Sequence, residues 1–93
     1  MEKLEMDDLP RKQILRFAMD MERELLENDH KSGWSGMPLG YLLRRVRQEV
    51  EELSKAIAEK KNVVGEAADV ANFCMMIADN WREEFDSEDI DGS

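Results

Sequence analysis

The stretch GEAADVANFCMMIADN, residues 65–80, is a mostly apolar segment with two polar interruptions. Between residues 67 and 78 its only strongly polar members are Asp69 and Asn72. The surrounding residues extend the predicted helix over 63–85, and a helix that is apolar on nearly all sides must be buried on nearly all sides. Two further helices from one short chain cannot easily cover it. We therefore expect a dimer or tetramer whose interface includes this helix.

Two more helical segments precede this one. Over residues 11–28, apolar side chains recur at spacings of three and four and predict an amphipathic helix, through Ile14, Phe17, Ala18, Met21 and Leu25. The segment NDHKSGWSGMP, residues 28–38, is rich in glycine, serine and proline and predicts a loop. The helical period resumes over 39–61, through Leu39, Val46, Val50, Leu53 and Ile57. The expected fold is all-α, an antiparallel hairpin of the last two helices plus an N-terminal helix.

Local signals place the helix ends. Asp7 or Asp8 can cap the first helix, and Pro10 suits its first turn. Residues 60–62 form a short turn between the last two helices, and Asn62 can cap the third helix.

Composition places the chain among small acidic domains. Its 93 residues carry a net charge of −9 and form one domain, 1–93, with ends at 1–9 and 86–93 that we expect to be disordered. The negative charge argues against a nucleic acid polymer as partner. No signal peptide and no apolar run near ~20 residues are present, so we expect no membrane segment. The single cysteine, Cys74, excludes an intrachain disulfide and fits the cytoplasm.

Two acidic pairs stand out, Glu49-x-x-Glu52 and Glu66-x-x-Asp69. The i, i+3 spacing places both carboxylates of a pair on one helix face. Because the hairpin is antiparallel, Glu52 and Asp69 are predicted at one level, ~13.5 and ~12 Å from the turn. Glu49 and Asn72 match at the next level. Four acids and an amide can therefore converge on one patch between two helices.

Clustered carboxylates need to be neutralised. Two of them about 5 Å apart repel by roughly 3 kcal/mol at an effective dielectric constant near 20, whereas a whole domain is stable by only about 5–15 kcal/mol. A divalent cation removes this repulsion, and an all-oxygen ligand set favours Mg²⁺, or Mn²⁺, over zinc. A di-iron bundle needs Glu-x-x-His on two helices, and no histidine follows His30.

Simpler interpretations stay open for each motif. Glu49 and Glu52 alone also fit a solvated helix face, and Glu51 adds ambiguity about which acids of this run face the patch. Asp69 and Asn72 also fit a buried polar pair that sets helix register. The matching levels of the two pairs favour a site over both alternatives.

Taken together, these residues resemble the MazG-like branch of the all-α nucleoside triphosphate pyrophosphatases. The match covers roughly residues 30–81 and runs through HKSGW, LLRRVRQEVEELSKAI and GEAADVANFCMMIADN. Either acidic pair alone is a weak signal. The two pairs together with the Lys-x-Gly-Trp loop upstream and ADVANF downstream are fairly specific.

The resemblance implies a function and a set of residues. It implies an all-α dimer or tetramer that hydrolyses a nucleoside triphosphate to the monophosphate and pyrophosphate, a house-cleaning role in the nucleotide pool, and Mg²⁺ held by Glu49, Glu52, Glu66 and Asp69. The chain looks like a minimal unit of that family. A water attacks the α-phosphorus in this scheme, with Glu52 as the candidate general base.

Four further residues are candidates for binding the substrate. Lys31 can contact a phosphate, and Trp34 can either stack on a base or cover the end of the hairpin core. Arg45 lies one turn before Glu49 and can either reach a phosphate or pair with a glutamate. Asn72 completes the patch beside the acids.

The alternative is a non-catalytic oligomeric helical module that binds a nucleotide or a protein partner. Its acids would hold a metal for structural reasons only. The chain lacks a GxxxxGK[ST] loop, so the usual γ-phosphate chemistry is disfavoured in either case. The preferred base and sugar stay open.

Overall fold

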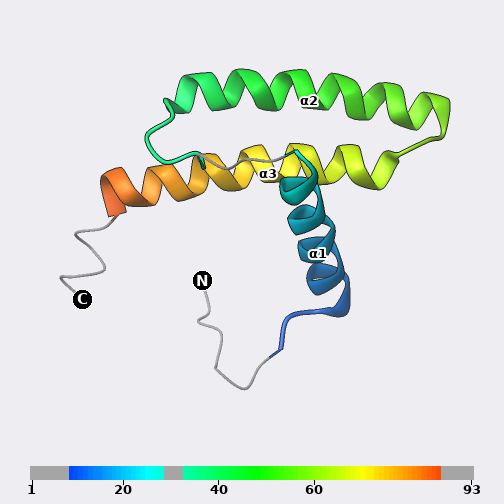
Figure 1. Cartoon of the computed structure of the whole chain (residues 1–93), viewed down its shortest axis with the longest axis horizontal. Helices are drawn as coiled ribbons and strands as arrows, with labels where there is room; N and C mark the ends of the chain where they lie inside the picture. The colour runs from blue at the N-terminus through cyan, green and yellow to red at the C-terminus, as the bar shows by residue number, and fades with distance from the viewer. Residues whose placement is uncertain (1–8, 29–32, 87–93) are drawn as a thin grey trace.

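The computed structural model describes residues 9–28 and 33–86, and this part of the chain is all-helical, as predicted. Figure 1 shows its helices, which are α1 (Lys12–Glu27), α2 (Leu39–Glu59) and α3 (Val63–Trp81). A π-helical turn, Arg82–Asp86, continues α3 to the predicted end of the third helix. None of the described helices is both long and apolar enough to cross a bilayer.

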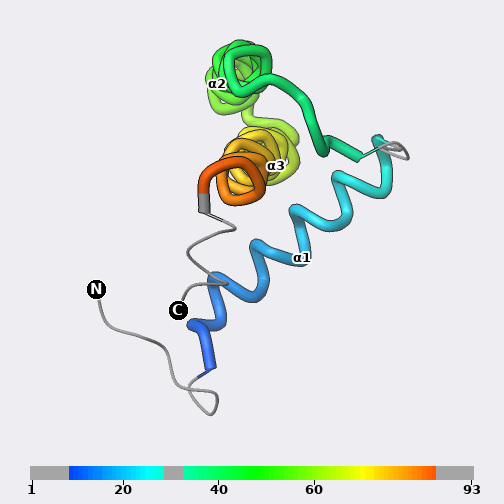
Figure 2. The backbone as a smooth tube through the Cα atoms, turned by 90° about the vertical axis from the view of Figure 1, so that its left-hand side faces the viewer, coloured from blue at the N-terminus to red at the C-terminus, as the bar shows by residue number. Residues whose placement is uncertain are grey.

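Helices α2 and α3 form the predicted antiparallel hairpin and lie side by side in both views (Figures 1 and 2). Helix α2 ends at Glu59, two residues before the predicted end, because Lys60 takes a left-handed conformation with φ of 58°. The Lys60 N–H donates to the Ile57 carbonyl and the Lys61 N–H to the Ala56 carbonyl. This pair of bonds is a Schellman motif, which satisfies the last carbonyls of the helix.

The predicted helix starts need two corrections. Asn62 occupies the N-cap position of α3, but its side chain makes no capping hydrogen bond, because its backbone is left-handed with φ of 55°. Arg11 is the N-cap of α1, so Pro10 precedes the helix instead of lying in its first turn. Asp7 and Asp8 lie outside the described residues, as do nearly all of the two ends expected to be disordered.

The core of the hairpin is small. A stripe on α3 at spacings of three and four is buried, and it consists of Gly65, Ala68, Asn72, Met76 and Asn80. From α2 only Leu42 and Ala56 are buried. Among the described residues the buried apolar side chains are therefore two large ones and two alanines, Leu42, Met76, Ala56 and Ala68. A core of this size stabilises a chain only weakly.

Helix α1 runs across α3 instead of along it. Its C-terminal half meets the middle of α3, and its N-terminal half extends away from the hairpin (Figures 1 and 2). No α1 side chain is fully buried, and Ile14 and Met19 are exposed. One specific bond joins the two helices, since the Asn72 amide nitrogen donates to the Met21 carbonyl over 3.0 Å.

The face of α3 opposite the buried stripe is apolar and open. Cys74 is exposed, and Trp81 and Phe85 keep 48% and 51% of their surface accessible. The two rings lie against each other, with centroids 4.2 Å apart. The expectation that one chain does not cover α3 on all sides therefore holds for this face.

Candidate metal centre and substrate cavity

Three carboxylates from two helices meet at one point. Glu49 comes from α2, and Glu66 and Asp69 come from adjacent turns of α3. One oxygen from each lies within 4.8 Å of the others, and all three residues are partly buried. The i, i+3 spacing aligns the two α3 acids, and the antiparallel packing of the hairpin brings Glu49 to them. The structure thus brings together three of the four predicted metal ligands.

The fourth predicted ligand, Glu52, lies elsewhere. It is exposed on α2 and is not part of the group formed by Glu49, Glu66 and Asp69. Glu49, predicted one level further from the turn, is the α2 acid that reaches Asp69. The roles of Glu52 as metal ligand and general base stay predictions.

Asp69 shows the electrostatic consequence of this clustering. Burial raises the pKa of Asp69 from its ordinary 3.8 to about 7, assisted by a hydrogen bond with Glu66 and by the charges of Glu24, Glu49 and Glu66. In the absence of a cation, this carboxyl therefore keeps its proton to a higher pH than an ordinary aspartate does. A divalent cation would remove the repulsion and keep the carboxylate ionised.

Asn72 supplies a second polar group beside the acids. Only 3% of its surface is accessible. Its amide nitrogen donates to the Met21 carbonyl, whereas its amide oxygen, Oδ1, has no hydrogen-bond partner in the described part of the chain. Buried polar atoms are nearly always paired. The Oδ1 of Asn80, at the contact of α3 with the loop before α2, is also buried and has no partner among the described residues, so an unpaired oxygen is not peculiar to the acidic cluster.

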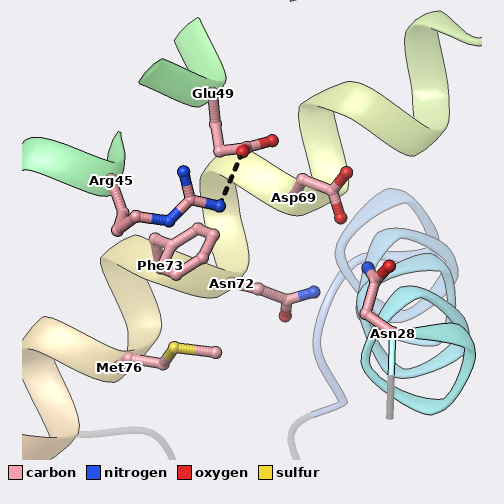
Figure 3. Close-up of a pocket in the computed structure, with 7 residues that line it drawn as sticks. All are labelled: Asn28, Arg45, Glu49, Asp69, Asn72, Phe73 and Met76. Atoms are coloured by element: carbon pink, nitrogen blue, oxygen red, sulfur yellow. Dashed lines mark hydrogen bonds and ion pairs between the residues drawn. The ribbon is translucent and has the colours of Figure 1, made fainter. Parts of the chain in front are cut away.

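Glu49, Asp69 and Asn72 line a cavity of about 230 Å³ between the helices (Figure 3). Its wall consists of Asn28, Arg45, Glu49, Asp69, Asn72, Phe73 and Met76. Arg45 borders it on the α2 side. The Arg45 guanidinium donates to the Glu49 carboxylate over 3.1 Å and also bonds Gln48. It lies 4.8 Å from the centre of the Phe73 ring, a cation–π contact. Two interpretations of Arg45 were possible, a contact with phosphate or an ion pair with a glutamate. In the structure Arg45 forms the ion pair with Glu49, and both residues line the cavity.

A second cavity of about 200 Å³ adjoins the first and shares with it Arg45, Phe73 and Met76. Its remaining wall is formed by Gly33, Trp34, Met37 and Tyr41. It is thus bordered by three aromatic rings and one guanidinium.

Trp34 enters this second cavity from the loop before α2. Its indole N–H donates to Asp79 over 2.9 Å, and the Asn80 amide nitrogen donates to the carbonyls of Trp34 and Met37 over 2.8 and 3.1 Å. These bonds fix the loop to the C-terminal part of α3. Trp34 therefore packs on the hairpin and lines a cavity at once, and both interpretations of it stay open. Lys31 lies outside the described residues.

Sequence reasoning missed the contribution of α1. Glu24 acts on Asp69 through its charge, and Asn28 lines the first cavity. A signal for both was present, because Met21, Glu24 and Asn28 follow at spacings of three and four and share the face that meets α3. The acidic pairs on the other two helices did not point to it.

The site therefore consists of a three-carboxylate cluster, an unpaired buried amide oxygen, and two adjoining cavities joined at Arg45 and Phe73. No family model, curated protein or solved structure matches the chain.

Proposed function

We propose that this protein is a Mg²⁺-dependent nucleotide pyrophosphohydrolase that converts a nucleoside triphosphate to the monophosphate and pyrophosphate. One observation carries the proposal. Oxygens of Glu49, Glu66 and Asp69 lie within 4.8 Å of one another at the edge of a cavity that also exposes the Arg45 guanidinium. A cation bound by these acids and the nearby Arg45 guanidinium would together neutralise the negative charge of a polyphosphate.

The residues present fit a divalent cation. All candidate donors are oxygens, those of the carboxylates of Glu49, Glu66 and Asp69. Mg²⁺ and Mn²⁺ prefer such donors, together with substrate phosphates. When bound, Mg²⁺ supplies positive charge at the phosphates and makes the α-phosphorus more electrophilic.

The remaining residues divide the substrate between the two cavities. The phosphates lie in the first cavity, where the Arg45 guanidinium exchanges its bond with Glu49 for phosphate oxygens. The base lies in the second, against Trp34, Tyr41 or Phe73, because an aromatic face stacks on any base. Lys31 is the further predicted phosphate contact.

The reaction is a hydrolysis. The oxygen of a water bonds to the α-phosphorus while the bond from the α-phosphorus to its bridging oxygen breaks, and pyrophosphate leaves with the bonding electrons. The proton of the water passes to a carboxylate, for which Glu52 is the predicted base. The resemblance of both acidic pairs to MazG-like enzymes supports this choice of bond. The proposal includes the cytoplasm as location and cleaning of the nucleotide pool as role.

A second copy of the chain completes the proposal. The open apolar face of α3 and of the π-helical turn after it consists of the half-buried Val70 and Ile77 and the exposed Cys74, Trp81 and Phe85. In the proposed homodimer this face packs against its counterpart, and two dimers can pair again into a tetramer. Four buried apolar side chains among the described residues of each chain are a small core, and an interface along α3 adds to it.

One observation favours the non-catalytic alternative. Glu52, the predicted base, is exposed and separate from the three clustered acids. A module that binds a nucleotide or a protein partner without turnover needs the cluster but no base.

Product analysis tests the proposal. A panel of nucleoside triphosphates is incubated with the protein in Mg²⁺ or in EDTA, and pyrophosphate and orthophosphate are quantified separately. We expect monophosphate and pyrophosphate in equal amounts with Mg²⁺ and none with EDTA. Orthophosphate with nucleoside diphosphate would contradict the mechanism, and binding without turnover would favour the alternative.

Matched variants assign the residues. Glu49→Gln and Glu52→Gln should each lower kcat by orders of magnitude, whereas Glu51→Gln, an exposed acid of the same run, should keep full activity. Mg²⁺ should also raise the melting temperature, since a cation at 100 times its Kd stabilises the folded state by about 2.7 kcal/mol. If Glu52→Gln alone keeps full turnover, another group is the base.

A further inference from the structure

Helix α1 carries one apolar stripe, of which only a part is covered. The stripe recurs at spacings of three and four and consists of Ile14, Phe17, Ala18, Met21 and Leu25. Met21 and Leu25, in the half of α1 that meets α3, are half-buried. Ala18 is exposed, and Ile14 keeps 56% of its surface accessible. The stripe that packs on α3 therefore continues, open to solvent, along the half of α1 that extends away from the hairpin (Figure 2).

This open half of α1 is basic, although the chain has a net charge of −9. Residues 11–18, RKQILRFA, contain three basic side chains and no acidic one. The C-terminal end of α3 has the complementary character, since residues 79–85, DNWREEF, contain three acidic side chains and one basic one. Within this end the rings of Trp81 and Phe85 lie against each other, and each is about half exposed. Both surfaces thus combine apolar side chains with charge, and the two charges are opposite.

Within one chain these two surfaces do not meet. Among the described elements, α1 lies against α3 only and has no contact with the π-helical turn after it. The Glu24 carboxylate of α1 lies beside Gly65, and the Asn72 amide bonds the Met21 carbonyl. The crossing of α1 over α3 is therefore centred near residue 68, away from the acidic end.

The proposed homodimer brings the two surfaces to the same level along α3. Its interface is the open face of α3, on which Cys74 lies near the centre. When two copies of α3 pack antiparallel about a two-fold axis at Cys74, each residue lies opposite the residue equally far beyond Cys74 in the other copy. Residue 68 is six residues before Cys74 and so lies opposite residue 80, six residues after it. Each α1 therefore crosses the other copy of α3 within one turn of Trp81.

The length of α1 also fits the distance between two packed helices. Such helices lie about 8–10 Å apart. Ile14 is seven residues before Met21, and this separation is ~10 Å along a helix that rises about 1.5 Å per residue. Because α1 runs across α3 and not along it, its N-terminal half extends sideways past α3 (Figures 1 and 2). The stripe that meets its own α3 at Met21 thus reaches a neighbouring α3 at Ile14.

We propose that the N-terminal half of α1 packs on a second copy of the chain. Ile14 and Ala18 lie against the partner's Trp81 and Phe85, and the basic surface of α1 faces the acidic end of the partner's α3. The proposal rests on the homodimer of the proposed function and adds to it a segment that each copy extends to the other. The C-terminal end of α1 places Asn28 on the wall of the first cavity, so the second copy fixes part of that wall.

Cross-linking between single-cysteine proteins tests the contact. In a Cys74→Ala background, one protein carries Ile14→Cys and another carries Phe85→Cys, so a bismaleimide can join only two different copies. The mixture should give a covalent dimer of twice 10.8 kDa in which these two positions are joined. Neither protein should cross-link when it is alone. Leu26→Cys, at a position that is 73% exposed at the other end of α1, is the control and should not join to position 85.

Charge reversal tests the electrostatic part of the contact. Arg16→Glu brings an acid to the acidic end of the partner's α3, and Glu84→Arg brings a base to the basic half of the partner's α1. Each should raise the dissociation constant of the dimer by at least about 10-fold, measured by analytical ultracentrifugation. Both substitutions in one chain should restore most of the affinity. Arg44→Glu, the same change at an exposed position of α2, is the control and should leave the constant unchanged.

The outcomes separate this inference from the proposed function. If Cys74→Glu dissociates the dimer while Arg16→Glu keeps the wild-type constant and positions 14 and 85 do not join, the homodimer stands and the role of α1 is refuted. Tighter association of Glu84→Arg, which lowers the net negative charge, would show a general charge effect and would also refute it. A wild type that is monomeric at micromolar concentration would refute the homodimer and this inference together. Neither experiment requires Mg²⁺ or a nucleotide, so both results hold whether or not the protein hydrolyses one.

Discussion

Asp69 is the residue at which burial and charge act together. Burial first, then the hydrogen bond with Glu66 and the charges of Glu24, Glu49 and Glu66, raise its pKa to about 7. The unfolded chain keeps a pKa near 3.8 at this position. At pH values between 3.8 and about 7, the folded state binds the proton of Asp69 more tightly than the unfolded state does. The free energy of unfolding of the metal-free protein therefore falls as the pH rises through this window.

Asp69→Asn should remove that loss of stability. In EDTA at pH 8 we expect the variant to be more stable than the wild type, on the order of 1 kcal/mol once solvent screening of a partly exposed group is considered. Near pH 4 the two proteins should be about equally stable, because the wild-type carboxyl is then protonated in the folded state. Urea denaturation at both pH values measures the difference. Equal stability at pH 8 would show that Asp69 carries no electrostatic strain.

Asn72 and Asn80 form a natural pair for comparison. Both are nearly fully buried on α3, with 3% and 5% of their surface accessible, and each holds a separate element. Asn72 bonds the Met21 carbonyl of α1, whereas Asn80 bonds the Trp34 and Met37 carbonyls of the loop before α2.

Each asparagine should therefore protect a different segment. Asn72→Ala leaves the Met21 carbonyl unpaired, which costs about 1–3 kcal/mol, and should speed hydrogen exchange over α1. Asn80→Ala should cost a similar amount and speed exchange over residues 33–38. Exchange mass spectrometry resolves the two segments, and each variant is the control for the other. Identical exchange patterns in both variants would contradict separate anchoring.

At the scale of the helices, the end of α2 carries an unfavourable residue. Lys60 is exposed and left-handed, with φ of 58°, in the position where Schellman motifs usually have glycine. A left-handed conformation costs an ordinary residue roughly 1–2 kcal/mol.

Lys60→Gly should therefore stabilise the hairpin by about 0.5–1 kcal/mol, after part of the gain is offset by the greater entropy of glycine in the unfolded chain. Chemical denaturation measures this change. Glu59→Gly, one residue earlier and still helical, should instead destabilise by about 1 kcal/mol. A loss of stability in Lys60→Gly would show that the lysine side chain makes a favourable contribution that outweighs the strain.

At the scale of the whole molecule, the proposed assembly depends on the open face of α3. Cys74 lies near the centre of this face and is exposed in the single chain. A charge there would be buried against a second copy and would cost several kcal/mol without a partner.

Cys74→Glu should therefore dissociate the assembly. Light scattering at micromolar concentration should give a multiple of 10.8 kDa for the wild type and for Cys74→Ala, and 10.8 kDa for Cys74→Glu. The melting temperature of the wild type should rise with protein concentration, since association stabilises the folded state by mass action. A wild type that stays monomeric and stable at this concentration would refute the assembly.

The sequence by itself determined the helical class and most helix bounds. Apolar residues recurring at three and four place the helices at 12–27, 39–59 and 63–81, within a few residues of the bounds expected. The pairing of Glu66 with Asp69 follows from the same local geometry, because a helix aligns residues three apart whatever surrounds it. Periodicity reports which face of a helix is buried, and this information is contained within each segment.

Only the tertiary structure decided which helices supply the site. Glu49 reaches Asp69 while Glu52 stays exposed, because long-range packing of α2 on α3 sets the register between two helices. Glu24 of α1 comes to lie beside Gly65 for the same reason. Gly65 leaves space for the Glu24 carboxylate where α1 crosses α3, and the hydrogen bond from Asn72 to the Met21 carbonyl joins the two helices. The left-handed backbone of Lys60 likewise follows from closing the hairpin and not from its own preference, whereas Asn62 is of a residue type that adopts this conformation readily. Contacts between distant segments depend on side-chain volume in three dimensions, which no local pattern records.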